Sequence, residues 1–344
     1  MRGLVLLEYT ADYLDAYLME QASKNHFHGS ILLADRNGVI LSKGYGYSNY
    51  KDKIKNGPAS RYQIASLTKQ FTALAVMQLQ EKGLLNTTDP IRFYLPDYPN
   101  GDRITIKHLL SHTSGIPDFL GEELLDIELE LSPLDRYISR FIEEPLEFNP
   151  GQRFNYSNSG YILLAKIIET ATGDSYANNI QQLIFDPLGM ENSGFFTSPE
   201  DIFPTVGYLA LNRGTVQAPI IYGHGESGLY STVEDLYLWD RALYTEKLVT
   251  KKALKEALYS CINKPAFVSD GPLHALAQNN WIGYGWFINK QNKYKIWHDG
   301  EVHGFISSIN RYMDQKKVLI MLSNCNLSKA DDILAYLESA LLKM

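Results

Sequence analysis

The stretch Gln63-Ile64-Ala65-Ser66-Leu67-Thr68-Lys69 marks a change of pattern, because from Leu67 to Leu85 apolar residues recur at helical spacing. At positions i and i+3 of a helix, Ser66 and Lys69 share one face, with Cβ atoms about 5–6 Å apart. A serine hydroxyl becomes an effective nucleophile only when a neighbouring group takes its proton. The N-terminal end of a helix also places backbone N–H groups and a positive dipole end beside it. Ser66 is therefore our candidate nucleophile, and Lys69 is its candidate activating partner.

This spacing is weak evidence alone, because the chain contains it twice. The second copy, Ser48-Asn49-Tyr50-Lys51, lies in a Tyr/Asn-rich turn that no apolar helix follows. The competing interpretation of Ser66 is a plain helix cap with an exposed Lys69 beside it. The choice depends on whether other groups suited to acyl transfer accompany the pair.

Two later motifs supply such groups. Tyr156-Ser157-Asn158 precedes a predicted helix and can offer a phenol and an amide to one cleft, or instead pack and cap that helix. His298-Asp299-Gly300 ends a predicted strand. The glycine there lets a ligand approach the backbone, and the next N–H group, that of Glu301, can point at an oxyanion. The competing interpretation of His298 is a structural residue at a strand end.

Strand patterns lie near both ends of the chain and helical patterns fill the middle. Strands are predicted over 30–33, 38–42, 283–289, 293–298, 305–313 and 317–323, and helices over 13–22, 67–85, 104–110, 158–172, 232–244 and 330–342. We therefore expect an α+β fold, in which an antiparallel sheet contains both ends of the chain and is flanked by helices. The first and last helices would cover one sheet face. A mostly helical lobe, about 63–274, would be inserted into an α/β lobe, about 1–62 plus 275–344, to give a single catalytic unit over 1–344.

Composition excludes several classes of function. The 344 residues carry a formal net charge of -7, which does not suit a protein that coats nucleic acid or anionic lipid. The two cysteines, Cys261 and Cys325, form no C-x-x-C pair, so we expect ordinary thiols, no metal and no cofactor. The apolar run at the start is cut off by Glu8 and is too short for a signal sequence or a membrane span. As written, the chain is expected to be cytoplasmic, and extracytoplasmic if a leader was removed.

The chain resembles the serine β-lactamase and penicillin-binding protein superfamily in the order of its three motifs, S-x-x-K, Y-x-N and H-x-G. The similarity is greatest to the class C β-lactamase branch, which also contains D,D-peptidases, D-aminopeptidases and esterases. Connecting segments strengthen the resemblance, which runs from about Ser30 to the last strand: Ile106 to Ile116, Phe148 to Gly151, Asp186 to Met190 and Ser227 to Thr232. It implies a β-lactamase/transpeptidase-like fold for nearly the whole chain.

The resemblance also implies catalytic roles. Ser66 would attack a carbonyl, and Lys69 and Tyr156 would share the proton traffic. For Tyr156 to act as a phenolate near neutral pH, its pKa must fall by about three units. A charged Lys69 within hydrogen-bond distance could supply that shift in a partly desolvated cleft. The sequence leaves open which of the two groups accepts the proton first.

Five further residues are implied to bind the substrate. Asn158 would bind the amide of the acyl part, while His298 and Gly300 would line the cleft along the strand. The backbone N–H of Glu301 would complete an oxyanion hole with that of the nucleophile, and Phe119 would border the cleft. The expected substrate is a small molecule or short peptide, with β-lactams as further candidates.

The third motif bears on the substrate class. Related enzymes carry a lysine where this chain has His298, and histidine is mostly neutral near pH 7. Asp299 would repel a substrate carboxylate if it faced the cleft. We therefore expect a serine hydrolase that acts on esters or amides through an acyl-enzyme, with weak β-lactamase activity at most. A substrate with a free amine and D-amino-acid peptides remain open.

Alternative functions fit less well. An α/β-hydrolase needs G-x-S-x-G, and Gly225-Glu226-Ser227-Gly228-Leu229 fails at its last position. A metal hydrolase needs clustered histidines, and His26-Phe27-His28 is isolated. A catalytically idle member that senses β-lactams or binds a partner protein would not need both proton-transfer groups. We expect no obligate protein partner and no nucleic acid.

Overall fold

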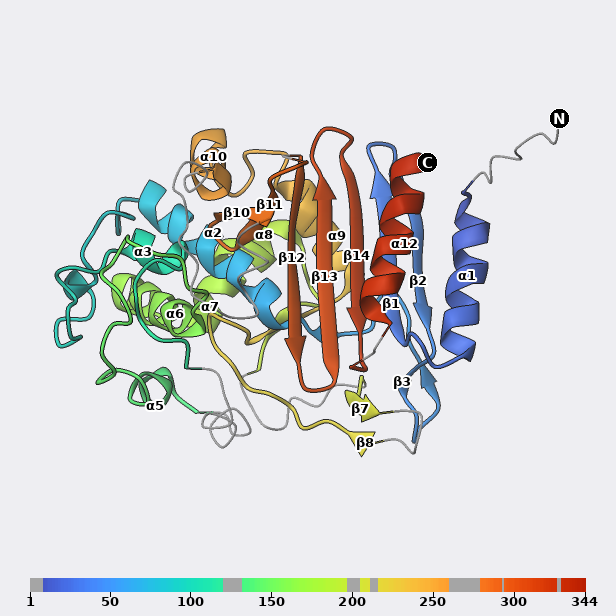
Figure 1. Ribbon diagram of the computed structural model, residues 1–344, viewed down its shortest axis with the longest axis horizontal. Helices are drawn as coiled ribbons and strands as arrows, with labels where there is room; N and C mark the ends of the chain where they lie inside the picture. The colour runs from blue at the N-terminus through green and yellow to red at the C-terminus, as the bar shows by residue number, and fades with distance from the viewer. Residues whose placement is uncertain are drawn as a thin grey trace.

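In the computed structural model, a seven-stranded antiparallel sheet is the centre of the protein (Figure 1). The structure describes residues 9–119, 132–196, 205–210, 216–259, 279–292, 294–326 and 329–344. The strands lie in the order β10 (Asn280–Gly283), β11 (Trp286–Asn289), β12 (Lys295–Val302), β13 (Phe305–Tyr312), β14 (Lys317–Ser323), β1 (Gly29–Asp35) and β2 (Gly38–Tyr45). The last strand pairs with the first, with Leu32 opposite Ile320. Both ends of the chain therefore share one sheet, which confirms the predicted α+β class.

The two terminal helices cover one face of this sheet, as predicted. α1 (Ala11–Ser23) and α12 (Ala330–Lys343) lie side by side there. Leu18 from α1 and Leu337 from α12 are buried in one apolar cluster with Leu319 and Met321 of β14. Because β14 is covered on both faces, its sequence is a nearly continuous apolar run rather than an alternating pattern.

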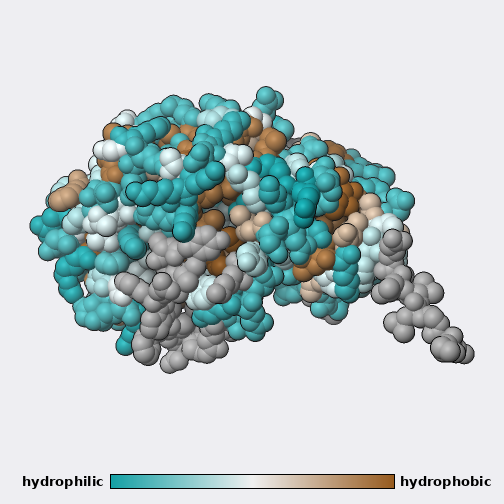
Figure 2. All heavy atoms as spheres, turned by 90° about the horizontal axis from the view of Figure 1, so that it is seen from above, coloured by the Kyte–Doolittle hydropathy of each residue, from teal (hydrophilic) through white to brown (hydrophobic). Residues whose placement is uncertain are grey.

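The opposite face of the sheet packs against the helices of the middle segment. α9 (Val233–Ala242) contacts β14 and β1, and α2 (Thr68–Glu81) packs against α6 (Asn158–Thr172). Nearly every residue of α2 is buried, which is typical of a helix in the core of a large protein. α6 ends at Gly173, whose φ of 75° is left-handed. The surface in Figure 2 is mostly hydrophilic, with hydrophobic residues in separate patches.

Shorter elements complete the described chain. The helices are α3 (Ile106–Leu110), α5 (Leu134–Ile138), α7 (Tyr176–Ile180), α8 (Asp186–Leu188) and α10 (Lys251–Tyr259), with 3-10 turns η1 (Ala65–Leu67) and η2 (Ile91–Phe93) and a π-helical turn η3 (Gln181–Phe185). Small sheets pair β3 (Tyr47–Asn49) with β4 (Ile54–Lys55), β5 (Tyr62–Gln63) and β6 (Gly194–Phe195) with β9 (Leu229–Ser231), and β7 (Tyr208–Ala210) with β8 (Val216–Gln217). None of the described helices has both the length and the apolar character needed to cross a membrane.

Two predicted elements differ from the structure. The strand predicted over 283–289 is instead the hairpin of β10 and β11, which turns at Gly285 with φ of 72°. A Cβ atom at Gly285 would lie 2.6 Å from the carbonyl oxygen of Lys69, so the glycine allows this turn to approach α2. The strand predicted over 293–298 continues to Val302, and Lys293 lies outside the described residues. The limits of the two lobes stay a prediction.

A buried ion pair joins the sheet to α9, and its loss is expected to destabilise the fold. Arg311 and Asp240 are both fully buried, and Arg311 Nε donates to Asp240 Oδ1 at 2.5 Å. We expect Asp240→Asn to lower the free energy of unfolding by about 3–5 kcal/mol, because a buried guanidinium is left uncompensated. Urea denaturation measures this change. Glu234→Gln removes an exposed carboxylate from the same helix and should cost about 1 kcal/mol or less; equal losses in the two variants would contradict the prediction.

Candidate active site

Ser66 lies in a strained backbone turn at the entrance to α2. The preceding residue, Ala65, has φ of 48°, a left-handed conformation that costs energy for any residue with a Cβ atom. Ser66 itself occupies the 3-10 turn η1 and lines the cleft. The structure does not support the competing interpretation of Ser66 as a helix cap. The N-cap residues of η1 and α2 are Ile64 and Leu67. The turn holds the hydroxyl beside the side chains of α2.

Lys69 is fully buried one helical turn away and directly contacts Ser66. Its Nζ lies 3.0 Å from Ser66 Oγ, 2.6 Å from Asn158 Oδ1 and 2.8 Å from the carbonyl oxygen of Glu226. Desolvation lowers the pKa of Lys69 to about 7, against the opposing charges of Glu226 and Asp118. A neutral amine is thus accessible near neutral pH. Its two N–H groups match the two carbonyl acceptors, and its lone pair can accept the Ser66 O–H.

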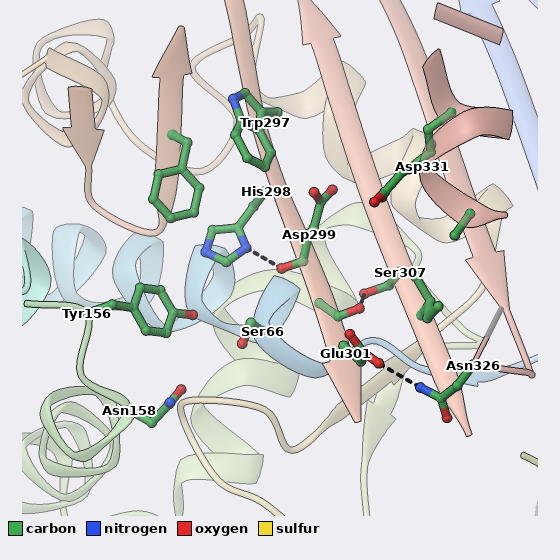
Figure 3. Close-up of a pocket in the computed structure, with 15 residues that line it drawn as sticks. Ser66, Tyr156, Asn158, Trp297, His298, Asp299, Glu301, Ser307, Asn326 and Asp331 are labelled. Carbon is green, nitrogen blue, oxygen red and sulfur yellow. Dashed lines mark hydrogen bonds between the residues drawn. The ribbon is translucent and has the colours of Figure 1, made fainter. Parts of the chain in front are cut away.

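Tyr156 approaches Ser66 from the other side, and its hydroxyl points toward that of Ser66 (Figure 3). Burial raises the pKa of Tyr156, and the nearby Ser66 hydroxyl lowers it by a smaller amount. The phenolate considered from the sequence is therefore not favoured. Lys69 Nζ lies 4.9 Å from the centre of the Tyr156 ring, and its hydrogen bonds within the described chain go to Ser66, Asn158 and Glu226 rather than to the phenol oxygen. These pKa directions favour Lys69 as the proton acceptor and Tyr156 as a phenol.

His112, which the sequence analysis did not single out, holds the segment around Tyr156 in three ways. Its ring stacks on Tyr156, with centroids 4.4 Å apart and planes 20° apart. Its Nδ1 accepts from the N–H of Ser157 at 3.1 Å, and its carbonyl oxygen accepts from the N–H of Asn155 at 2.9 Å. Burial lowers the pKa of His112, and the charge of Lys69 lowers it further. His112 is thus a neutral, fixed support for the phenol.

Asn158 is held in a single orientation by Asp118, which, like His112, the sequence analysis did not single out. Its backbone N–H donates to Asp118 Oδ1 at 2.8 Å, and its Nδ2 donates to the same oxygen at 3.1 Å. Its Oδ1 consequently faces Lys69. The alternative role of helix cap falls to Ser157, whose side chain accepts from the N–H of Gly160. Asp118 directly precedes Phe119, which was predicted to border the cleft, and this position next to Phe119 was the sequence signal for Asp118.

His298 faces the cleft from β12 with a defined tautomer. Its Nδ1 lies 2.6 Å from the carbonyl oxygen of Asp299, so Nδ1 carries the proton and Nε2 presents a lone pair. Burial lowers the pKa of His298 to about 3, and the charge of Lys69 adds to this effect. The imidazole is therefore neutral at physiological pH and cannot replace the lysine of related enzymes as a cation.

β12 passes so close to Ser66, the candidate nucleophile, that only glycine fits at position 300. A Cβ atom there would lie 2.6 Å from the carbonyl oxygen of Ile64 and 2.9 Å from the nitrogen of Ser66. Glu301 follows and also lines the cleft, with its carboxylate accepting from Asn326 Nδ2 at 2.8 Å. The structure does not bring Phe119 to this group of residues. Its ring packs toward Phe141, with centroids 6.2 Å apart, and it is not part of the cleft lining.

The resulting cleft has a volume of about 660 Å³ and contains Ser66, Tyr156, Asn158, His298 and Gly300. The second S-x-x-K copy is not part of it: Ser48 is buried, and its hydroxyl donates to the carbonyl oxygen of Ile54. Among the residues that the structure describes, no group of three or more His, Cys, Asp or Glu could hold a metal. Cys325 is a buried free thiol, and Cys261 lies outside the described residues.

With this geometry established, comparison with known proteins gives the family. The sequence model of the β-lactamase family matches residues 15–342. The chain belongs to the β-lactamase family. Penicillin-binding protein 4* of Bacillus subtilis (strain 168) is 33% identical over 322 residues, which are 88% of this chain and 69% of that protein. Protein flp of Staphylococcus aureus (strain COL) is 29% identical over 95% of this chain and 65% of its own length.

Solved structures agree with this membership. A penicillin-binding protein from Bacillus halodurans has a TM-score of 0.82 and 28% identity, covering 95% of this chain and 98% of its own. The D-amino acid amidase of Ochrobactrum anthropi SV3 has a TM-score of 0.81 at 21% identity, over 96% of this chain and 99% of its own, and supports the fold alone. β-Lactamase family membership places the chain among the serine hydrolases related to penicillin-binding proteins, as the resemblance implied.

Proposed function

We propose that this protein hydrolyses ester or amide bonds through an acyl-enzyme on Ser66, as a peptidase or esterase with weak β-lactamase activity at most. The observation that carries the proposal is the contact of 3.0 Å between Ser66 Oγ and the fully buried Lys69 Nζ. A lysine with a pKa of about 7 can take a proton at neutral pH, whereas an ordinary lysine cannot. An idle binding member would gain nothing from burying this amine at the cost of its desolvation.

The contacts support an acylation step in which Lys69 and Tyr156 move the protons. As Ser66 Oγ forms a bond to the carbonyl carbon, its proton passes to the lone pair of Lys69 Nζ. The carbonyl oxygen becomes an oxyanion that we assign to the N–H groups of Ser66 and Glu301, each worth about 2.7–4 kcal/mol in such sites. When the bond to the leaving group breaks, Tyr156 donates its phenolic proton to the departing heteroatom. The resulting tyrosinate takes the proton held by Lys69, which restores both groups.

Deacylation uses the same groups with water as the nucleophile. Water adds to the acyl carbon and passes one proton to the neutral Lys69 Nζ. Ser66 Oγ leaves the tetrahedral intermediate and recovers a proton from Tyr156, which is reprotonated by Lys69. The product acid then departs. We assign Asn158 to the amide of the acyl part, because its orientation is fixed by Asp118.

The substrate preference rests on the neutral His298. A hydrogen bond to an ionised group contributes about 1.5–3 kcal/mol, and His298 offers no cation to a substrate carboxylate. We therefore expect kcat/KM for p-nitrophenyl esters to exceed that for nitrocefin by about tenfold or more. Steady-state kinetics measures both values, and a higher value for nitrocefin would contradict the peptidase or esterase assignment.

Intact-mass spectrometry tests the acyl-enzyme directly. The protein is incubated with p-nitrophenyl esters, D-amino-acid amides and β-lactams, and peptide mapping locates the adduct. We expect a single acyl group on Ser66 that is released within the turnover time for the true substrate class. Ser48→Ala, at the second S-x-x-K copy, should keep the adduct. A folded protein without modification at Ser66, even with a fluorophosphonate probe, would refute the proposed function, and an adduct that never hydrolyses would favour the sensor alternative.

A further inference from the structure

The catalytic cleft continues around the free edge of β12 to the helix α12. β11 pairs with β12 only at Trp297 and Ile296, so within the described chain no strand covers this edge from His298 onward. Side chains alternate between the two faces of a strand. His298 points to the side of Ser66, whereas Asp299 points toward α12 (Figure 3). We call the second part of the cleft the α12 arm, lined by Asp299, Glu301, Asn326, Ala330, Asp331 and Leu334.

The α12 arm carries negative charge without a cation of its own. Asp299, Glu301 and Asp331 line it, and among the described residues its lining includes no lysine or arginine. Among the described residues, the Asp299 carboxylate accepts a hydrogen bond from one side chain, the hydroxyl of Ser308, at 2.5 Å. The nearby Lys295 is already bound by Glu338, at 2.8 Å. Asp299 and Asp331 thus have no ion pair in the described part of the chain.

His298 provides an independent observation on the opposite side of the strand. Its side chain is 3% exposed, and its Nε2 has no hydrogen-bond partner among the described residues. Because Nδ1 donates to the carbonyl oxygen of Asp299, Nε2 is an acceptor aimed into the cleft. A ligand N–H group can donate a hydrogen bond to Nε2, whereas a ligand carboxylate is repelled by its lone pair. His298 therefore offers no cation to a ligand carboxylate, which agrees with the acidic lining of the α12 arm on the other side of the strand.

The position of the arm relative to the nucleophile decides which part of the substrate it receives. Asn158 and Asp331 lie on opposite sides of Ser66 in Figure 3. Under the proposed function, on which this step rests, the acyl part lies against Asn158. The leaving group then enters the α12 arm. We propose that the preferred substrates are esters or amides whose leaving group carries a positive charge, bound by Asp299 and Asp331.

The titration of Asp299 gives the proposal a second signature. Nearby protein atoms raise the pKa of the Asp299 carboxyl to about 6 by desolvation, although the residue is exposed to solvent. Asp331 and Glu338 of α12 raise it further, while Ser308 of β13 and Lys295 of β12 oppose them. Glu301 is the other carboxylate of β12 that lines the arm. Asp299 gains its charge above this pKa, so a preference for cations should grow as the pH rises from about 5 to 7.

A comparison of acetylthiocholine with 3,3-dimethylbutyl thioacetate tests the effect of a positive charge on the leaving group, because the two substrates have nearly the same shape. They differ by a quaternary nitrogen in place of a carbon, and the thiol product of each is measured with a disulfide reagent. We expect kcat/KM to favour the cationic thioester by about three- to tenfold at pH 7.5 and low salt. The ratio should fall toward one in 0.5 M NaCl, at pH 5, and in Asp299→Asn/Asp331→Asn.

Asp332→Asn is the matched control, because Asp332 is the next residue of α12 and pairs with Lys329 at 3.0 Å. It should keep the full ratio. A wild-type ratio of one or less, or an unchanged ratio in the double variant, overturns the charge proposal while cleavage through Ser66 leaves the proposed function intact. If neither thioester is cleaved, choline should protect Ser66 from fluorophosphonate better than 3,3-dimethylbutanol does. Equal protection overturns the charge proposal, and failure of the labelling itself overturns the proposed function.

Discussion

Ser66→Ala is expected to lower kcat for a p-nitrophenyl ester by about 10⁴-fold or more, because it removes the atom that we propose forms the acyl bond. Ser66 Oγ is the point where Lys69 and Tyr156 meet. With the hydroxyl gone, neither group has a proton to move in the first step. The binding groups and the oxyanion donors remain, so a small residual rate above that of water is expected. The measurement is steady-state hydrolysis, together with the loss of the mass adduct.

A folded control separates this result from a structural failure. The Ser66→Ala variant should keep the circular dichroism spectrum and the urea midpoint of the wild type, because the serine is only partly buried. Ser48→Ala provides the comparison at a serine with the same i and i+3 spacing to a lysine. It should keep wild-type kcat. A Ser66→Ala variant that keeps more than about one per cent of wild-type kcat would rule out a nucleophilic role, since its loss of activity would be far smaller than the expected loss of about 10⁴-fold.

Lys69→Met is expected to lower kcat/KM by about 10³-fold, which lies within the range for removal of a general base. Methionine keeps most of the length of the side chain but cannot accept a proton. In the wild type, desolvation places the pKa of Lys69 at about 7. The base form is the neutral amine, so kcat/KM should rise with pH through about 7 and then level off. The Lys69→Met variant should lose this rise, as shown by a pH–rate profile from pH 5 to 9.

Lys69→Arg distinguishes proton transfer from charge. A guanidinium stays protonated throughout this pH range, so it keeps the positive charge but cannot act as a base. We expect it to be as inactive as Lys69→Met and to show no rise near pH 7. High activity in Lys69→Arg, or an unchanged pH profile in Lys69→Met, would assign the base to another group, with Tyr156 the next candidate.

Much of the fold followed from local patterns in the sequence. The i and i+3 spacing placed Ser66 and Lys69 on one face, and the structure has these side chains 3.0 Å apart. Strand patterns at both ends led to a sheet that joins them, which the pairing of β1 with β14 confirms. These features depend on contacts within one element or on hydrophobic alternation. Both are written directly in the order of residues.

The supporting groups of the site could not be predicted, because they depend on contacts between distant segments. His112 stacks on Tyr156 from a separate loop. Glu226 contributes its backbone carbonyl, a group that every residue has, so no sequence motif marks it. The pKa values also needed the structure. Burial, which a sequence does not report, lowers the pKa of Lys69 and raises that of Tyr156.

Because Gly300 has no side chain, two properties of the cleft can change independently. One is the spacing between β12 and Ser66, and the other is the set of side chains that line the cleft. The spacing between β12 and the nucleophile is set by backbone atoms, since a Cβ at Gly300 would lie 2.9 Å from the nitrogen of Ser66. The neighbouring side chains Asp299 and Glu301 line the cleft without fixing that spacing. Substitutions at those two positions can therefore redirect the enzyme to new molecules while the bond-breaking apparatus stays in place. A single close backbone contact can thus hold the cleavage site in place while the molecules that are cleaved change.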